Sequence, residues 1–134
     1  MFIHMKKVLF VCVHNAGRSQ IAEAYFNRLS ALNKAVAFSA GTKPSKEINP
    51  VVVQVMKEAG FDLSRKTPKI LTLNMLENAD KVVTMGCGVE ETCPASFVPS
   101  EDWQIEDPEG NSIETVRRIR NEIELKVKRL LTEI

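Results

Sequence analysis

The 134-residue sequence lacks several features that would assign it to a broad class of protein. Its formal net charge is only +1, from 18 basic and 17 acidic residues, so nothing indicates a nucleic-acid-binding face or an acidic partner. The apolar run 8–13 ends after six residues, which is too short for a signal-peptide core or a membrane span. We therefore expect a soluble, cytoplasmic protein that binds neither nucleic acid nor membranes.

Histidine and cysteine, the usual ligands of zinc, are also scarce. The sequence has two histidines and three cysteines, and Cys87 and Cys93 do not form the closely spaced pair that is typical of zinc sites. We therefore expect no metal site. An odd number of cysteines in an apparently intracellular chain favours thiol chemistry over a framework of stabilising disulfides.

The chain shows no internal repeat, low-complexity tract or linker, so we expect one domain over residues 1–134, and a monomer. Apolar periodicity predicts strands at 7–12, 36–39 and 81–85, and helices from 19 to about 32, from 50 to 59, at 73–78 and from 111 or 112 onward. Residues 40–41 are expected to turn the chain and 103–110 to form a loop. Strands that alternate with helices predict an α/β fold, with a central four-stranded parallel sheet and helices on both faces.

Local signals mark the helix ends. Asn49 is a predicted N-cap before Pro50, with Gly60 beyond the C-terminal end, and Asn111 with Glu114 could form a capping box. Two helical stripes are predicted to face the core: Ile21, Ala22, Tyr25, Phe26 and Leu29, and Ile113, Val116, Ile119, Ile123, Val127 and Leu130.

The first predicted strand runs into a Cys-x5-Arg-Ser loop formed by Cys12, Arg18 and Ser19. Five intervening residues suit a loop that curls round a tetrahedral anion, with main-chain N–H groups pointing inward and a helix N-terminus behind them. The planar guanidinium of Arg18 can hold two anion oxygens. The same positive field favours the thiolate form of Cys12, which we expect to be a nucleophile near neutral pH.

We expect the whole loop to bind the oxyanion through Val13, His14, Asn15, Ala16, Gly17, Arg18 and Ser19. The Ser19 hydroxyl should lie within reach of the sulfur, while Asn15 and Gly17 are residue types that accept positive φ at low cost. For His14 we expect only a main-chain contribution.

A second group of residues is predicted to lie at the same edge of the sheet. Cys12 ends one strand and Cys87 follows another, and parallel strands present their carboxyl ends, where ligands bind, at one edge. Gly86 and Gly88 flank Cys87 and would allow its thiol to exchange partners between Cys12 and Cys93, which indicates redox chemistry.

Asp107-Pro108 lies in the polar loop before the last helix. If this loop folds over the anion site, Asp107 can act as the general acid, with Pro108 stiffening its backbone. Glu106 is the neighbouring alternative for that role.

These motifs, taken together, resemble a known superfamily. The matching positions are Asn15-x-x-Arg18-Ser19-Gln20-x-Ala22-Glu23, Phe38-Ser39-Ala40-Gly41, Val82-Val83-Thr84-Met85 followed by Cys87 and Cys93-Pro94, and Trp103 with Asp107-Pro108-x-Gly110. With Cys12, they resemble the low-molecular-weight protein tyrosine phosphatases, and more closely the arsenate reductases of that fold, which commonly couple to thioredoxin. Gln20 replaces a proline that is typical of the phosphatases, and no tyrosine stands beside the Asp-Pro pair.

The resemblance implies a relay of three thiols that reduces arsenate to arsenite without a metal or organic cofactor. Cys12 would attack arsenate, Asp107 would protonate the departing oxygen, and Cys87 and then Cys93 would carry the disulfide outward to thioredoxin or a similar thiol reductant. Ser39 is expected to support Asn15 by a hydrogen bond. Some relatives bind potassium through an acidic residue where this sequence has Lys69, so the resemblance implies no potassium site.

Two alternatives stay open. A phosphatase acting on phosphotyrosine or small phosphomonoesters would need Cys12, Arg18 and Asp107 but neither of the other cysteines. A module that only captures oxyanions or arsenite through its thiols would have no use for the general acid Asp107, because it has no leaving group to protonate.

Overall fold

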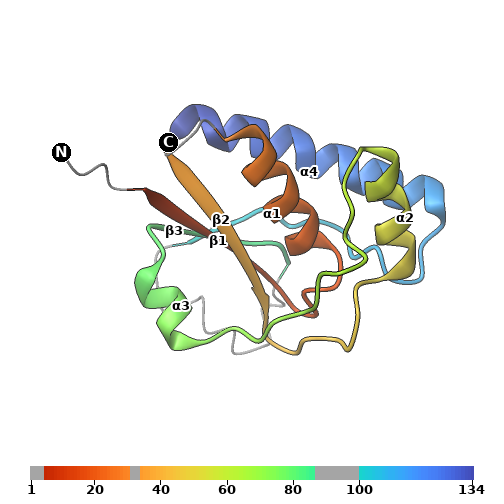
Figure 1. Ribbon diagram of the computed structural model, residues 1–134, viewed down its shortest axis with the longest axis horizontal. Helices are drawn as coiled ribbons and strands as arrows, with labels where there is room; N and C mark the ends of the chain where they lie inside the picture. Colours follow the sequence, from red (N-terminus) through yellow and green to blue (C-terminus); the bar gives the residue numbers. More distant parts are fainter. Residues whose placement is uncertain (1–4, 31–33, 87–99) are drawn as a thin grey trace.

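The computed structural model describes residues 5–30, 34–86 and 100–134. Its elements in chain order are β1 (Lys6–Cys12), α1 (Arg18–Leu29), β2 (Ala35–Gly41), α2 (Pro50–Glu58), α3 (Leu73–Asn78), β3 (Lys81–Thr84), β4 (Ser100–Asp102) and α4 (Ile113–Glu133). The four strands form one parallel sheet in the order β2-β1-β3-β4, with helices on both faces (Figure 1). The predicted fold class is therefore confirmed.

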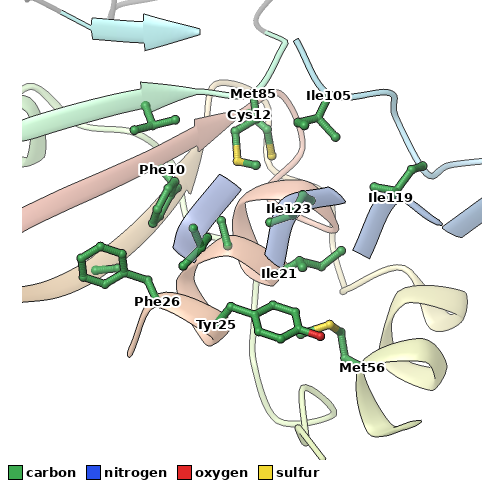
Figure 2. Packing of buried hydrophobic residues seen from close by; sticks show 14 of the residues in the cluster. Phe10, Cys12, Ile21, Tyr25, Phe26, Met56, Met85, Ile105, Ile119 and Ile123 are labelled. Carbon is green, nitrogen blue, oxygen red and sulfur yellow. The ribbon is translucent and has the colours of Figure 1, made fainter. Parts of the chain in front are cut away.

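The alternation of β1 side chains divides the core into two parts. Val8, Phe10 and Cys12 face the larger cluster, which α1, α2 and α4 cover, whereas Leu9 and Val11 face a smaller cluster beneath α3. Figure 2 shows Cys12 beside Met85 and Ile105 at the strand end of the larger cluster. The Cys12 thiol is thus held within the packed core.

The helix signals are partly confirmed. Asn49 caps α2 by accepting a 2.9 Å hydrogen bond from the Val51 N–H, and α3 has its predicted bounds. The predicted capping box of α4 is wrong, because the hydroxyl of Ser112 accepts from Thr115 N–H instead, while Asn111 bonds the main-chain oxygen of Asp107. The stripe of α4 is buried except for Ile113, which is half-buried.

Helix α1 is shorter than predicted. It ends at Leu29 because Ser30 adopts an extended conformation, and the Ser30 hydroxyl donates to the main-chain oxygen of Ala35 at 2.9 Å. Leu29 lies in the last turn and is 40% exposed, so its assignment to the core stripe is wrong.

Two strands also differ from prediction. β2 runs on through Ala40 and Gly41, where a turn was expected, because Gly41 exchanges main-chain hydrogen bonds with the segment 69–71. β3 ends at Thr84, one residue earlier than expected. The fourth strand, which the sequence analysis could not place, is the short polar segment Ser100–Asp102 at the edge of the sheet. Among the helices of the described residues, none combines the length and apolar character needed to cross a bilayer.

Candidate functional site

The loop between β1 and α1 surrounds the sulfur of Cys12 with hydrogen-bond donors. The Sγ atom lies 2.8 Å from Ser19 Oγ and 3.2 Å from the main-chain nitrogen of Asn15, which donates to it. Cys12 itself is only 2% exposed. Donors directed at a sulfur atom favour its anionic form, and the role of Cys12 as the nucleophile stays a prediction.

Asn15 organises this loop. Its φ of 51° confirms the predicted left-handed backbone, and its Nδ2 donates to Ser19 Oγ at 2.7 Å. Because the Ser19 oxygen accepts this bond, its own hydrogen is available to point at the Cys12 sulfur. The Asn15 side chain therefore sets the direction of the hydroxyl that contacts the nucleophile.

Two residues that sequence reasoning missed hold Asn15 in place. The Nε2 atom of Gln20 donates to the Asn15 side-chain oxygen at 2.9 Å and to its main-chain oxygen at 3.2 Å. The main-chain N–H of Lys69 donates to the same side-chain oxygen at 2.8 Å. Gln20 stood next to the Arg-Ser motif and could have been suspected, but no sequence signal links Lys69 to a residue 54 positions away.

Ser39 does not support Asn15, and that prediction is wrong. Its hydroxyl donates to the carboxylate of Glu23 at 2.8 Å, which joins β2 to α1. The expectation for Gly17 is also wrong, since its φ is −151°, which is extended backbone. Glycine is needed there because a Cβ atom would lie 2.8 Å from Pro108 Cγ.

Arg18 is buried at the start of α1 and fixed by two strand-end segments. Its Nη1 donates to the main-chain oxygens of Met85 at 2.6 Å and Ile105 at 3.0 Å, and a Cβ on Gly86 would lie 2.6 Å from the same nitrogen. Its Nη2 lies 3.8 Å from an Asp107 carboxylate oxygen. With Nη1 occupied by the protein, Nη2 and Nε are the nitrogens left for an anion.

The helix behind the loop adds further positive potential. Gly17, the N-cap of α1, offers no side-chain acceptor to the first N–H groups, and the first turn carries no acidic residue. Unsatisfied N–H groups at a helix N-terminus attract anions. The loop, Arg18 and α1 together present donors and positive potential of the kind that the predicted oxyanion site requires.

Asp107 lies opposite this site. Its carboxylate accepts from the Glu109 N–H at 3.0 Å and is partly exposed, and the following Pro108 is buried against Gly17. Glu106, the alternative general acid, instead pairs with Arg118 at 2.7 Å and does not line the cavities described below. The geometry therefore favours Asp107 as the acid.

Two cavities open beside Arg18 and Asp107. The first, of about 320 Å³, also borders Cys12, and the second, of about 310 Å³, reaches Gly86. The lining of the first is His14, Ala16, Gly17, Ser45, Glu47, Ile48, Asn49, Pro50, Pro108, Glu109 and Gly110, in addition to Cys12, Arg18 and Asp107. The second is lined by Val13, His14, Thr42 and Lys43, in addition to Arg18, Gly86 and Asp107.

Among the described residues, His14, Asp107 and Glu109 have ligand atoms within 4.8 Å of one another and could in principle hold a metal ion. The Arg18 guanidinium beside Asp107 opposes a cation there. The other predicted site residues, Cys87 and Cys93, lie outside the described residues, and of the flanking glycines only Gly86 is described.

Curated relatives of this chain carry the names of arsenate reductases. The chain is 41% identical over 128 residues to a putative arsenate reductase from Halobacterium salinarum, covering 92% of this chain and 89% of the relative. It is 37% identical over 134 residues to the glutaredoxin arsenate reductase of a Synechocystis species, covering 97% and 99% respectively.

Solved structures share the fold. An arsenate reductase in a phosphate-binding state matches with a TM-score of 0.84 and 35% identity, over 97% of this chain and 99% of that one. A thioredoxin-dependent arsenate reductase from Corynebacterium glutamicum has a TM-score of 0.76 and 36% identity, over 96% and 61%. The arginine phosphatase YwlE of Geobacillus stearothermophilus has a TM-score of 0.81 and 26% identity, over 96% and 92%.

Residues 7–134 match the family described as low molecular weight phosphotyrosine protein phosphatase, a span that contains the nucleophile loop, the Asp107 segment and all four strands except the first residue of β1. The chain belongs to the low molecular weight phosphotyrosine protein phosphatase family.

Proposed function

We propose that this protein reduces arsenate to arsenite for arsenic detoxification, beginning with attack by Cys12. The observation that carries the proposal is the pocket itself, in which the Cys12 sulfur lies 2.8 Å from Ser19 Oγ at the base of an oxyanion site, with Arg18 and Asp107 beside it. The names of relatives at 37–41% identity over most of the chain support arsenate as the oxyanion.

In the first step the Cys12 sulfur bonds to arsenic while one arsenate oxygen departs as water. Asp107 donates the proton that this oxygen needs, and Arg18 with the loop N–H groups balances the charge on the remaining oxygens. Because Arg18 is held by the main chain at Met85 and Ile105, it can do this without reorganising.

The second and third steps use the other two cysteines. The Cys87 thiolate attacks the Cys12 sulfur, the arsenic–sulfur bond breaks with its electron pair remaining on arsenic, and arsenite leaves. Cys93 then attacks Cys87, which releases Cys12 as a thiolate and leaves a Cys87–Cys93 disulfide. The close approach of Gly86 to Arg18 supports this order, because Gly86 directly precedes Cys87 in the chain.

A thiol reductant must then regenerate the enzyme. We propose thioredoxin or a similar protein thiol, and the solved relative described as thioredoxin-dependent supports that choice, while another relative is named for glutaredoxin. We also propose that the protein acts in the cytoplasm. It would do so as a monomer with a single domain over residues 1–134.

The test measures arsenate reduction and aryl phosphate hydrolysis in parallel for wild type, Cys87→Ser and Cys12→Ser. Cys87→Ser should lose reduction but keep residual phosphatase turnover, and Cys12→Ser should lose both. Reduction by Cys87→Ser at the wild-type rate, with the same thioredoxin supply, would disprove the relay.

Phosphate-ester hydrolysis is the second candidate function. Cys12, Arg18 and Asp107 are the groups that it requires, and all three border one cavity. Membership of the low molecular weight phosphotyrosine protein phosphatase family supports it as well. Full phosphatase activity with no arsenate reduction in wild type would make hydrolysis the main function.

A further inference from the structure

Gln20 is a buried polar residue that takes no direct part in the proposed reaction. It lies in the first turn of α1 and is 1% exposed. Its Nε2 atom is 2.9 Å from the side-chain oxygen and 3.2 Å from the main-chain oxygen of Asn15, and 3.4 Å from the main-chain oxygen of Thr67. Because three acceptors surround this atom, the nitrogen end of the amide must face them.

The oxygen end of the same amide gains nothing from this arrangement. Gln20 Oε1 is buried and has no hydrogen-bond partner among the described residues. A buried acceptor without a partner lowers stability, and an apolar side chain of similar shape would avoid that loss. The bonds that Nε2 makes to Asn15 are therefore the better reason for a glutamine at this position.

Three hydrogen bonds in series connect Gln20 to the Cys12 sulfur. Gln20 Nε2 and the main-chain N–H of Lys69 both donate to Asn15 Oδ1, which leaves Asn15 Nδ2 directed at Ser19 Oγ, 2.7 Å away. Since Ser19 Oγ accepts that bond, its own hydrogen is free to point at Cys12 Sγ at 2.8 Å. Within the described part of the chain, Gln20 is the only side chain that donates to Asn15 Oδ1.

A second bond from Gln20 acts on the backbone of Asn15. The Asn15 N–H donates to the Cys12 sulfur at 3.2 Å, from a residue whose φ is 51°. The bond from Gln20 Nε2 to the Asn15 main-chain oxygen helps to hold this unusual conformation. Gln20 therefore supports both donors that contact the sulfur, although it does not touch the sulfur itself.

We propose that Gln20 is a positioning residue for the Cys12 nucleophile, acting through Asn15. By holding Asn15 in place it keeps the Ser19 hydroxyl and the Asn15 N–H on the sulfur, and so favours the thiolate. The proposal rests on Cys12 being the nucleophile of the proposed function. The charged and titratable groups that line the cavity at Cys12 are unchanged when Gln20 is replaced; they are His14, Arg18, Glu47, Asp107 and Glu109.

The experiment measures the rate at which iodoacetamide alkylates Cys12, from about pH 4 to about pH 9. A background carrying Cys87→Ser and Cys93→Ser leaves Cys12 as the only thiol. Gln20→Met keeps the length of the side chain and removes its N–H donors, and Gln20→Leu is a second variant of similar size. Each should move the midpoint of the pH profile upward and slow alkylation below that midpoint by about three- to tenfold. The limiting rate at high pH should stay within about twofold.

Asn27→Ala is the matched control. Asn27 is another amide side chain of α1, and it bonds the main-chain oxygen and N–H of Ala37 at 3.1 and 2.8 Å, on β2. This variant should lower the melting temperature and leave the pH profile unchanged. If the Gln20 variants likewise lose thermal stability but keep the wild-type midpoint, Gln20 has only a structural role and the proposal is overturned.

Ser19→Ala tests the route from Gln20 to the sulfur. Adding Gln20→Met to Ser19→Ala should shift the midpoint by less than Gln20→Met does alone, because part of the connection is already missing. An equal shift in both backgrounds would overturn the proposal. Arsenate reduction by wild type is measured separately: if it is absent, the reductase proposal fails, while the alkylation profile still decides the role of Gln20.

Discussion

Pro108 presses against Gly17 so closely that its Cγ lies 2.8 Å from the position of a Cβ atom on that glycine. This contact joins the segment that carries Asp107 to the start of α1, where the anion site lies. Asp107, the proposed general acid, is therefore positioned by packing between a proline and a residue that has no side chain.

Gly17→Ala should consequently displace the Asp107 segment. We expect a loss of about 1–3 kcal/mol in the free energy of unfolding, from overpacking, and a fall in kcat of about tenfold or more because the acid is misplaced. Urea denaturation and steady-state arsenate reduction measure the two effects. Adding Pro108→Ala should restore part of both, since it removes the clashing atom. A double variant as impaired as the sum of the two single variants would show that this contact does not position the acid.

Asn15 should matter through both its backbone and its side chain. Asn15→Gly removes the hydrogen bonds to Ser19, Gln20 and Lys69 but tolerates the φ of 51°, and should lower the free energy of unfolding by about 1–3 kcal/mol. Asn15→Ala should cost about 1 kcal/mol more, because alanine disfavours positive φ. Chemical denaturation of both variants measures the difference. Equal stabilities would mean that the backbone conformation at this position is not a constraint.

Two serine-to-alanine changes should affect different properties of the protein, one its activity and the other its stability. Ser19→Ala removes the hydroxyl that contacts the Cys12 sulfur and should lower kcat/KM for arsenate by about tenfold or more. Ser39→Ala removes only the bond to Glu23, and should cost about 1 kcal/mol of stability while leaving kcat/KM within about twofold. Parallel kinetics and thermal unfolding test this pair. A large loss of activity in Ser39→Ala without unfolding would restore a role for Ser39 in the loop.

Glu101 should make the edge strand sensitive to acid. Hydrogen bonds from Trp103 Nε1 and then from Lys81 hold the pKa of its carboxyl below the ordinary value of 4.5, although burial opposes this. Because the pKa is lowered on folding, the carboxylate stabilises the fold fully above pH 4.5, and this contribution is lost as the pH falls through the folded-state value.

The measurement is the free energy of unfolding of wild type, Glu101→Gln and Trp103→Phe between pH 7 and pH 3. Glu101→Gln should be less stable than wild type by up to about 1 kcal/mol at pH 7, with the difference shrinking as the pH falls towards the folded-state pKa. Trp103→Phe should show a weaker dependence on pH than wild type, since the main donor is gone. A difference that grows on acidification would contradict the assignment.

Local signals in the sequence determined much of the molecule. The apolar strand before Cys12, the cap at Asn49 and the periodic stripe of α4 each depend on residues within a few positions of one another, and each is confirmed. The contacts of the Cys12 sulfur belong to the same class, because Asn15 and Ser19 lie in the loop that follows it. Local structure can be predicted from the sequence when the contacts that stabilise it form between residues close together in the chain.

Tertiary structure alone decided the rest. The β4 strand Ser100–Asp102 is polar and exposed, so no hydrophobic alternation marks it, and only pairing with β3 makes it a strand. Asn15, Arg18 and Gly17 each also have a partner 54 to 91 residues away, at Lys69, Ile105 and Pro108 respectively. These contacts depend on the packing of the sheet and helices, because that packing determines which distant segments lie within contact distance of one another. The sequence therefore specified the strand, the loop and the cysteine proposed as nucleophile, while the packed fold decided which distant groups orient them.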